Sequence, residues 1–327
     1  MNVLVSIQQP VRAWQIPQGA VASLRERFPH VTFVHAVDAE QRADGLPACE
    51  VAYTWILSAA ELARAPRLRW VHTSAVAVET LCLPELFARG VLVSNTRGVQ
   101  ATPIAEHVFA TVLALAKQLP FALEQQRHAR WAQNEFAGDR LPWLLRGRTL
   151  GLIGVGTIGG EIARLARAFG MTVIATRRRP EQADVAAIAE VLPASALDAL
   201  LVRADVLVVA APLTPETDGL VGAAQIARMK RGSVLVNVGR ARIIQTAALV
   251  DALHAGHLAG ASLDVYPQEP LPPDHPLWTC PNIILTPHTS GFRHGHWEEV
   301  VELFADNLMR FEKGEGLRYR VVPELGY

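Results

Sequence analysis

Residues 149–159, TLGLIGVGTIG, decide the fold of this chain. The apolar run Thr149–Ile153 leads directly into three closely spaced glycines. A helical pattern with one apolar face follows and ends near Gly170, and a second apolar run occupies residues 172–176. The order of strand, glycine turn, helix and strand predicts a βαβ unit within a parallel sheet.

Each glycine of the turn has its own physical reason. Gly154 permits a tight turn, Gly156 lets the backbone approach a pyrophosphate, and Gly159 allows the helix to pack closely on the strand. Free N–H groups at the helix start, near Thr157 and Ile158, then face the phosphates. We therefore expect dinucleotide binding here. A glycine-rich turn that serves packing alone is the alternative.

The end of the second strand distinguishes between the two nicotinamide dinucleotides. Units that bind NAD place an Asp or Glu about 20 residues after the turn, where the acid holds the ribose hydroxyls. This chain has TRRR at residues 176–179 instead. Guanidinium groups bind a 2′-phosphate through charge-assisted hydrogen bonds. Arg177 and Arg178 therefore predict NADP(H) as the preferred cofactor, with NAD(H) less favoured. Solvated loop arginines are the alternative.

Outside the turn, short apolar runs alternate with helical patterns along nearly the whole chain. The candidate strands are Val3–Ile7, Val31–His35, Val51–Trp55, Leu68–His72, Val91–Ser94, Thr149–Val155, Thr172–Thr176, Val206–Ala210, Ser233–Val238, Ala261–Tyr266 and Ile283–Leu285. Long helical segments cover Ile104–Leu119 and His296–Phe311. This alternation predicts an α/β fold whose parallel strands are covered on both faces.

Bulk properties exclude several classes of protein. The chain has 327 residues, enough for two domains of about 150 residues. Lys+Arg and Asp+Glu both count 31, so charge gives no reason to expect nucleic acid or a membrane surface as partner. Cys49, Cys82 and Cys280 lie far apart, which predicts no metal site and a reduced, cytoplasmic protein. The N-terminus resembles a strand and not a signal peptide, and no segment is apolar enough to span a bilayer.

Several short motifs follow one another in a fixed order from Leu92 to the end of the chain. They are Ala105-Glu106-His107, the glycine turn, PLTPET at residues 212–217, VNVGR at 236–240, LDVYPQEP at 263–270 and TPH at 286–288. As a set they resemble the D-isomer-specific 2-hydroxyacid dehydrogenase family, whereas the part before Leu92 matches more loosely. The resemblance implies an NAD(P)-dependent oxidoreductase that moves a hydride between the nicotinamide ring and a 2-keto or 2-hydroxy acid.

The resemblance also implies a catalytic set of Arg240, Glu269 and His288. A planar guanidinium can grip the adjacent carboxylate and carbonyl of a 2-keto acid. Hydride attack leaves an alkoxide that must take up a proton, and His288 is the candidate acid because its ordinary pKa lies near neutrality. Glu269 would orient the imidazole and favour its charged form. Surface residues or a structural ion pair are the alternative for any one of the three.

Further positions carry over from the family by their motifs. Asp264 and the backbone of Val238 would hold the nicotinamide carboxamide, Thr102 would lie near the nicotinamide, and Pro212 would bound the adenosine site.

In the substrate loop, backbone N–H groups at Ser74, Ala75 and Val76 would meet the substrate carboxylate. Here the chain departs from the family, which often has glycines where Ala75 and Ala77 stand. Alanine fits if φ is negative and is strained if φ is positive.

The implied architecture is discontinuous. A Rossmann doubly wound nucleotide domain, residues 99–288, is inserted into a smaller flavodoxin-like substrate domain, residues 1–98 plus 289–327. The segment Ile104–Arg140 resembles the arm of the family's two-fold dimer, so we expect a homodimer. Trp131 and Phe136 are contacts there or part of an intramolecular core.

Three histidines outside the catalytic set receive structural interpretations. His107 lies within a helical pattern, where a packed or capped role is favoured over catalysis. His294 and His296 follow His288 closely and are expected to be solvated, with lining of the cleft as the alternative.

Two functions follow from these observations. The first is an NADPH-dependent reductase of small 2-keto acids, with glyoxylate and hydroxypyruvate as leading substrates and D-2-hydroxy acids as products. The second is a non-catalytic dinucleotide sensor or corepressor-like interaction protein on the same fold.

Overall fold

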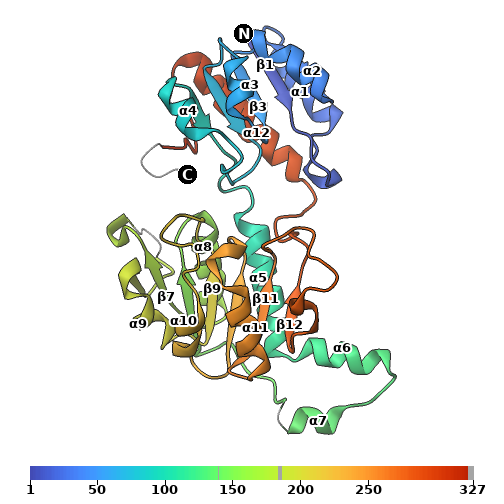
Figure 1. The fold of residues 1–327 in the computed structure, drawn as a ribbon, viewed down its shortest axis with the longest axis vertical. Coiled ribbons are helices and arrows are strands. Elements are labelled where there is room, and N and C mark those ends of the chain that lie inside the picture. Colours follow the sequence, from blue (N-terminus) through green and yellow to red (C-terminus); the bar gives the residue numbers. More distant parts are fainter. Residues whose placement is uncertain (139, 183–185, 323–327) are drawn as a thin grey trace. The chain divides into compact units, whose positions relative to one another are not determined.

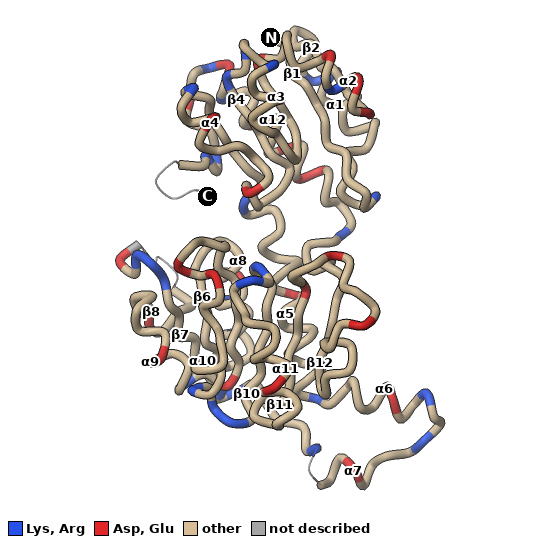
Figure 2. The backbone as a smooth tube through the Cα atoms, viewed as in Figure 1, with Lys and Arg blue, Asp and Glu red and all other residues tan. Residues whose placement is uncertain are grey.

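The computed structural model describes residues 1–138, 140–182 and 186–322, and it divides into two compact units. Unit 1 combines Met1–Gln100 with Phe292–Tyr327, and unit 2 is Ala101–Gly291. Each unit holds one parallel sheet with helices on its two faces (Figure 1). The α/β class expected from the alternating pattern is therefore confirmed. Basic and acidic residues are interspersed along the backbone of both units (Figure 2).

The sheet of unit 1 has five strands in the order β2-β1-β3-β4-β5. This is the flavodoxin-like order expected for the smaller domain. Its strands are β1 Asn2–Ser6, β2 Thr32–His35, β3 Val51–Thr54, β4 Trp70–Thr73 and β5 Leu92–Ser94. Its helices are α1 Gln18–Arg27, α2 Ala39–Gly45, α3 Ala59–Ala63, α4 Leu83–Ala88 and α12 His296–Lys313, with 3-10 turns η1 Arg12–Trp14 and η2 Leu46–Ala48.

The core of unit 1 is completed by the far end of the chain. Helix α12 has a long apolar face, and its side chains Val300, Phe304 and Leu308 are fully buried. They join the cluster that contains Val3 and Val5 of β1. The intervening strand residue Leu4 points to the opposite face of the sheet and packs in a second cluster, with residues of α3 and α4.

The sheet of unit 2 has seven strands in the order β12-β11-β10-β9-β6-β7-β8. Numbered from β6, the first six strands give the doubly wound order 3-2-1-4-5-6 of the Rossmann fold. The strands are β6 Thr149–Ile153, β7 Thr172–Arg177, β8 Glu190–Pro193, β9 Val206–Val209, β10 Ser233–Asn237, β11 Leu258–Leu263 and β12 Ile283–Leu285. The helices are α5 Ala101–Ala116, α6 Leu119–Arg127, α7 Gln133–Ala137, α8 Thr157–Ala168, α9 Leu197–Leu201, α10 Ala223–Arg228 and α11 Thr246–His254, with 3-10 turns η3 Pro180–Gln182, η4 Ala194–Ala196, η5 Ala241–Ile243 and η6 Pro276–Thr279.

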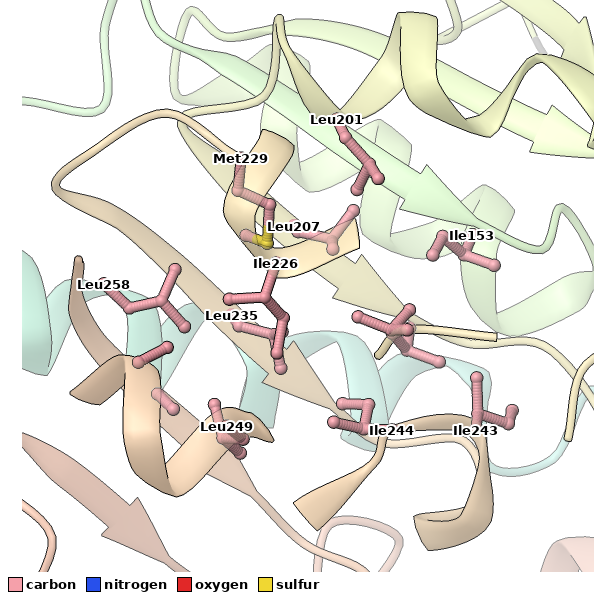
Figure 3. Packing of buried hydrophobic residues seen from close by; sticks show 14 of the residues in the cluster. Ile153, Leu201, Leu207, Ile226, Met229, Leu235, Ile243, Ile244, Leu249 and Leu258 are labelled. Carbon is pink, nitrogen blue, oxygen red and sulfur yellow. The ribbon is translucent and has the colours of Figure 1, made fainter. Parts of the chain in front are cut away.

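Two apolar clusters cover the two faces of this sheet. On β9, Val206 and Val208 point to the cluster beneath α5 and α8, whereas Leu207 points to the cluster beneath α9, α10 and α11. Figure 3 shows part of the second cluster, in which Leu207 lies close to Leu201 and Ile226. Because every residue of β9 is buried, the strand consists of apolar residues without alternation.

The structure departs from the sequence predictions at particular strands. Strand β8 was not predicted, because it is an edge strand with half-exposed side chains and a proline. Strand β11 begins at Leu258 and ends at Leu263, earlier than the predicted Ala261–Tyr266. The segment that resembles the dimer arm continues beyond α5 as α6 and α7, both within unit 2. In the described part of the chain, no helix combines the length and the apolar character needed to cross a membrane.

Candidate active site

The strand order of unit 2 places a switch point beside β6. Strands β7 and β8 lie on one side of β6, and β9 to β12 lie on the other. Ligands of doubly wound sheets bind outside the carboxyl ends of the strands at such a point. The glycine turn follows β6 directly and opens α8, so it lies at the switch point.

The glycine turn forms a cradle of backbone atoms with no room for side chains at Gly154 and Gly159. Gly154 has φ +97°, and a Cβ there would lie 2.8 Å from the backbone of Ala211. A Cβ on Gly159 would lie 2.4 Å from the Gly154 carbonyl oxygen, so helix and turn touch. Gly156 is exposed and has open space where a side chain would stand. Helix α8 begins at Thr157. The N–H groups in the first turn of a helix are the groups that bind an anion.

The arginine run begins at the last residue of β7. Arg177 is half-buried and Arg178 is exposed, and the run forms a blue stretch near the grey trace in Figure 2. An acid from another loop lies near it. Hydrogen bonds with Thr214 and with its own backbone, together with the charge of Arg178, lower the pKa of Glu216. Arg178 therefore lies within electrostatic reach of the PLTPET loop.

Glu269 and His288 form a hydrogen-bonded pair beyond the carboxyl ends of β11 and β12. His288 Nδ1 lies 2.8 Å from Glu269 Oε2, and the Tyr266 N–H donates to Glu269 Oε1 at 3.0 Å. The two side chains remain 53% and 38% exposed, so the pair is accessible. The bond to Glu269 raises the pKa of His288 above 6.5, although burial opposes the shift. Burial raises the pKa of Glu269, but the bonds from His288 and Tyr266 outweigh it and lower the pKa.

Arg240 is held in the loop after β10. Asn237 fixes this loop, because its Nδ2 donates to the Arg240 carbonyl at 3.1 Å and its Oδ1 accepts the Gly239 N–H at 3.0 Å. The guanidinium Nη1 donates to the Gly239 carbonyl at 2.9 Å. Its charge contributes to lowering the pKa of both Glu269 and His288. The three side chains therefore share one electrostatic environment within unit 2.

The backbone of His288 is strained and is tied to Asp264. His288 has φ 54°, a left-handed conformation that costs of order 1–3 kcal/mol in a residue other than glycine. Asp264 is only 1% exposed, and its carboxylate accepts the N–H groups of Thr289 at 2.9 Å and Ser290 at 3.0 Å. A third bond comes from the Thr286 hydroxyl. Both Thr286 and Tyr266 were missed as site residues, although they lie within the TPH and LDVYPQEP motifs.

The remaining cofactor positions of unit 2 lie at the surface or at strand ends. Thr102 is exposed in the first turn of α5, and Pro212 is exposed after β9. Val238 is buried directly after β10, and its N–H donates to Val209. Among the described residues, no group of three or more His, Cys, Asp or Glu side chains is arranged to hold a metal ion.

The predicted substrate loop lies in unit 1 after β4. Ser74 and Ala75 are buried, and Val76 is half-buried. Hydrogen bonds from Asn95 to the Val76 carbonyl at 2.7 Å and from the Thr96 hydroxyl to the Ser74 carbonyl at 3.1 Å fix the loop. Neither Ala75 nor Ala77 has a positive φ, so alanine replaces glycine here without strain. Contact with substrate stays a prediction for these residues.

One histidine prediction was wrong. His296 was expected to be solvated, but it is 6% exposed at the start of α12. Its ring meets Trp14 edge-on at 5.1 Å and Trp297 at 5.4 Å between centroids. The burial lowers its pKa to about 4. His294 is exposed, as expected for a loop histidine.

Known proteins that resemble this chain in sequence and structure include dehydrogenases and reductases. Residues 109–290 match the model of the NAD binding domain of the D-isomer specific 2-hydroxyacid dehydrogenases. A glyoxylate reductase of Korarchaeum cryptofilum is 37% identical over 254 residues, which cover 77% of this chain and 75% of the relative. A glyoxylate reductase of Thermococcus onnurineus is 33% identical over 92% of both chains. A probable 2-hydroxyacid dehydrogenase of Rhizobium etli, solved with NADP, HEPES and L(+)-tartaric acid, superposes with a TM-score of 0.84 at 26% identity, covering 100% of this chain and 99% of the other.

Proposed function

Because the chain belongs to the D-isomer-specific 2-hydroxyacid dehydrogenase family, we propose that it reduces small 2-keto acids to D-2-hydroxy acids with NADPH. Glyoxylate and hydroxypyruvate are the leading substrates, since the relatives at 33–37% identity include glyoxylate reductases. The observation that carries the proposal is the bond between Glu269 and His288, with Arg240 in the same electrostatic environment.

His288 is suited to deliver the proton. Its Nδ1 is bonded to Glu269, so Nε2 is the nitrogen that can hand a proton to the carbonyl oxygen of the substrate. The raised pKa of His288 keeps a larger share of the imidazole charged near neutral pH. Acid–base catalysis by a positioned group contributes about 10²–10⁴-fold to the rate.

Arg240 is suited to bind the substrate. A 2-keto acid presents a carboxylate and a carbonyl oxygen side by side, and a guanidinium fork can bond to both. The same positive charge would stabilise the alkoxide that develops as the carbonyl is reduced. A bound nicotinamide dinucleotide supplies the hydride. In the glycine cradle, the N–H groups near Thr157 and Ile158 would hold its pyrophosphate.

Preference for NADPH rests on the arginines at the end of β7. Arg177 and Arg178 stand where NAD-binding units have an acid, and their guanidinium groups would bond to the 2′-phosphate. Asp264, Val238, Thr102 and Pro212 complete the proposed cofactor contacts.

A kinetic panel tests the function. The purified protein is mixed with NADPH or NADH and with glyoxylate, hydroxypyruvate, pyruvate or phenylpyruvate, and oxidation of the nicotinamide is followed by absorbance. We expect turnover of at least one small 2-keto acid, with a higher kcat/KM for NADPH than for NADH. Absence of turnover with every acid, despite NADPH binding, would favour the non-catalytic sensor.

We further propose that α6 and α7 mediate a homodimer. Trp131, between these helices, is 88% exposed, and Leu119 and Leu123 of α6 are also exposed. Phe136 packs against Phe121 inside the arm, at 5.4 Å between ring centroids, so it belongs to an intramolecular contact. Light scattering should give twice the chain mass, and Leu123→Asp combined with Trp131→Glu should return the protein to a monomer.

A further inference from the structure

Thr286 is the centre of a set of polar contacts beside the turn that carries His288, which we call the catalytic turn. Its hydroxyl donates to Asp264 Oδ1 at 2.6 Å, and its N–H donates to the Leu263 carbonyl at 3.0 Å. Its own carbonyl accepts the His288 N–H at 2.9 Å and lies 2.9 Å from the Tyr266 hydroxyl. Thr286 therefore joins the end of β11 to the turn that carries His288.

His107 of α5 reaches the same hydroxyl. Its Nε2 lies 3.2 Å from Thr286 Oγ1. A hydroxyl has one proton, and the short contact with Asp264 identifies the carboxylate as its acceptor, so His107 supplies the proton in this second contact. Burial lowers the pKa of His107, with Asp264 opposing the shift, which favours the neutral ring. As the donor in this contact, the neutral ring carries its proton on Nε2.

We propose that His107 and Thr286 are positioning residues for His288. They act through Asp264, because the hydroxyl that His107 orients holds the carboxylate where it accepts the N–H groups of Thr289 and Ser290. Those two bonds maintain the left-handed backbone at His288 and so align its imidazole with Glu269. The effect on turnover rests on the proposed function, whereas the alignment itself can be measured without substrate.

The chemistry of the pair supports a directed role over simple packing. An apolar pair could fill the same half-buried space without removing polar groups from water, which is costly unless they are hydrogen-bonded. His107 and Thr286 instead form a chain of hydrogen bonds that ends on the carboxylate of Asp264. This chain joins α5 to the catalytic turn, across a separation of 179 residues between His107 and Thr286.

Paired variants separate the hydrogen bonds from the packing. Thr286→Val removes the hydroxyl at nearly constant volume, and Thr286→Ser keeps it. His107→Leu removes the donor, and His107→Gln keeps an N–H group in reach. Thr111→Val is the matched control, because this buried threonine of α5 donates to the Val108 carbonyl of its own helix at 3.1 Å.

The decisive measurement is an NMR titration of the His288 imidazole in the ligand-free protein. The signal is assigned by its loss in His288→Asn. We expect Thr286→Val and His107→Leu to lower the pKa of His288, because the imidazole loses its alignment with Glu269. Thr286→Ser, His107→Gln and Thr111→Val should retain the wild-type value. An unchanged pKa of His288 in both disruptive variants, with native circular dichroism, would overturn the proposal.

Turnover provides a second readout. The two disruptive variants should lower kcat by about tenfold, as for one lost hydrogen bond to a charged group, while the KM for the 2-keto acid changes little. Should Thr286→Val not fold, His107→Leu breaks the same chain one bond further from Asp264. A wild-type protein without turnover would contradict the proposed function alone, since the titration still decides the positioning role.

Discussion

Glu269 Oε2 lies 2.8 Å from His288 Nδ1, and the other oxygen of the same carboxylate accepts the N–H of Tyr266. The backbone bond fixes the carboxylate, and the carboxylate in turn fixes the imidazole. The hydrogen bond with Glu269 is the main cause of the raised pKa of His288. The pair therefore sets the pH range in which the histidine can act as an acid.

Glu269→Gln should shift the pH profile of reduction. The carbonyl oxygen takes its proton from charged His288, so kcat is highest below the pKa of His288 and falls as pH rises through it. Because the pKa of His288 is raised, the histidine remains charged, and reduction remains fast, up to a higher pH. The amide removes the main cause of that rise, so the falling limb should move to lower pH.

The pH profile is measured as kcat from mildly acidic to mildly alkaline pH. Glu124→Gln is the control, because it removes another histidine–glutamate contact, between Glu124 of the exposed helix α6 and His128 directly after that helix. A falling limb that stays in place in Glu269→Gln would contradict the assignment of His288 as the acid.

Arg240→Lys should weaken productive substrate binding although the charge is kept. Lysine cannot reproduce the planar fork, so at least one charge-assisted bond is lost, and kcat/KM should fall by about 10- to 100-fold. Binding of NADPH, measured by fluorescence, should be unchanged. Arg242→Lys alters a neighbouring arginine that pairs with Asp218 and should leave kcat/KM near the wild-type value. Equal losses in both variants would place substrate binding elsewhere.

Replacing Arg177 and Arg178 by alanine should raise the Kd of NADPH and leave that of NADH unchanged. Each lost bond to a charged group is worth about 1.5–3 kcal/mol, so the double variant should bind NADPH at least about tenfold more weakly. Calorimetry with both dinucleotides measures the difference. Arg164→Ala, an exposed arginine of α8 paired with Glu161, serves as control. Parallel losses for both dinucleotides would argue against recognition of the 2′-phosphate.

Gly159→Ala should destabilise unit 2 and weaken dinucleotide binding. Its Cβ would lie 2.4 Å from the Gly154 carbonyl, so α8 must move away from the turn. Overpacking of this kind costs about 1–3 kcal/mol. Gly19→Ala in the first turn of α1 meets nothing within 4 Å and should be neutral or stabilising. Thermal unfolding monitored by circular dichroism compares the two, and a native melting temperature in Gly159→Ala would contradict the close packing.

Much of the fold could be predicted because parallel strands that are buried on both faces consist of consecutive apolar residues. Strand β9 is one example, because each of its residues is buried and must be apolar. The turn after β6 is another, because its close backbone contacts require glycine. Strand β8 lacks such a run of apolar residues, because it lies at the edge of the sheet beside β7 and begins with Glu190. The end of β11 was placed too late because the buried apolar residues Val265 and Tyr266 follow Asp264, although the last paired residue of the strand is Leu263.

The sequence predicts those residues of the site that lie in recognisable motifs, but not the contacts between residues far apart in the chain. Arg240, Glu269 and His288 each follow a strand end, and the structure brings all three into unit 2. The contact of His107 with Thr286 joins residues far apart in the sequence and depends on side-chain rotamers, so no local pattern reveals it. His296 was misjudged for the same reason, because Trp14 comes from the opposite end of the chain. The cytoplasmic location stays a prediction.

The burial of α12 in unit 1 has a consequence for synthesis in the cell. Val300, Phe304 and Leu308 complete an apolar layer whose other side is made of β1 and α1. A ribosome releases β1 and α1 first and α12 only after all of unit 2 has been translated. The nascent N-terminal segment therefore carries an uncovered apolar face throughout elongation, which makes it a target for chaperones, while unit 2 can fold before the chain is finished.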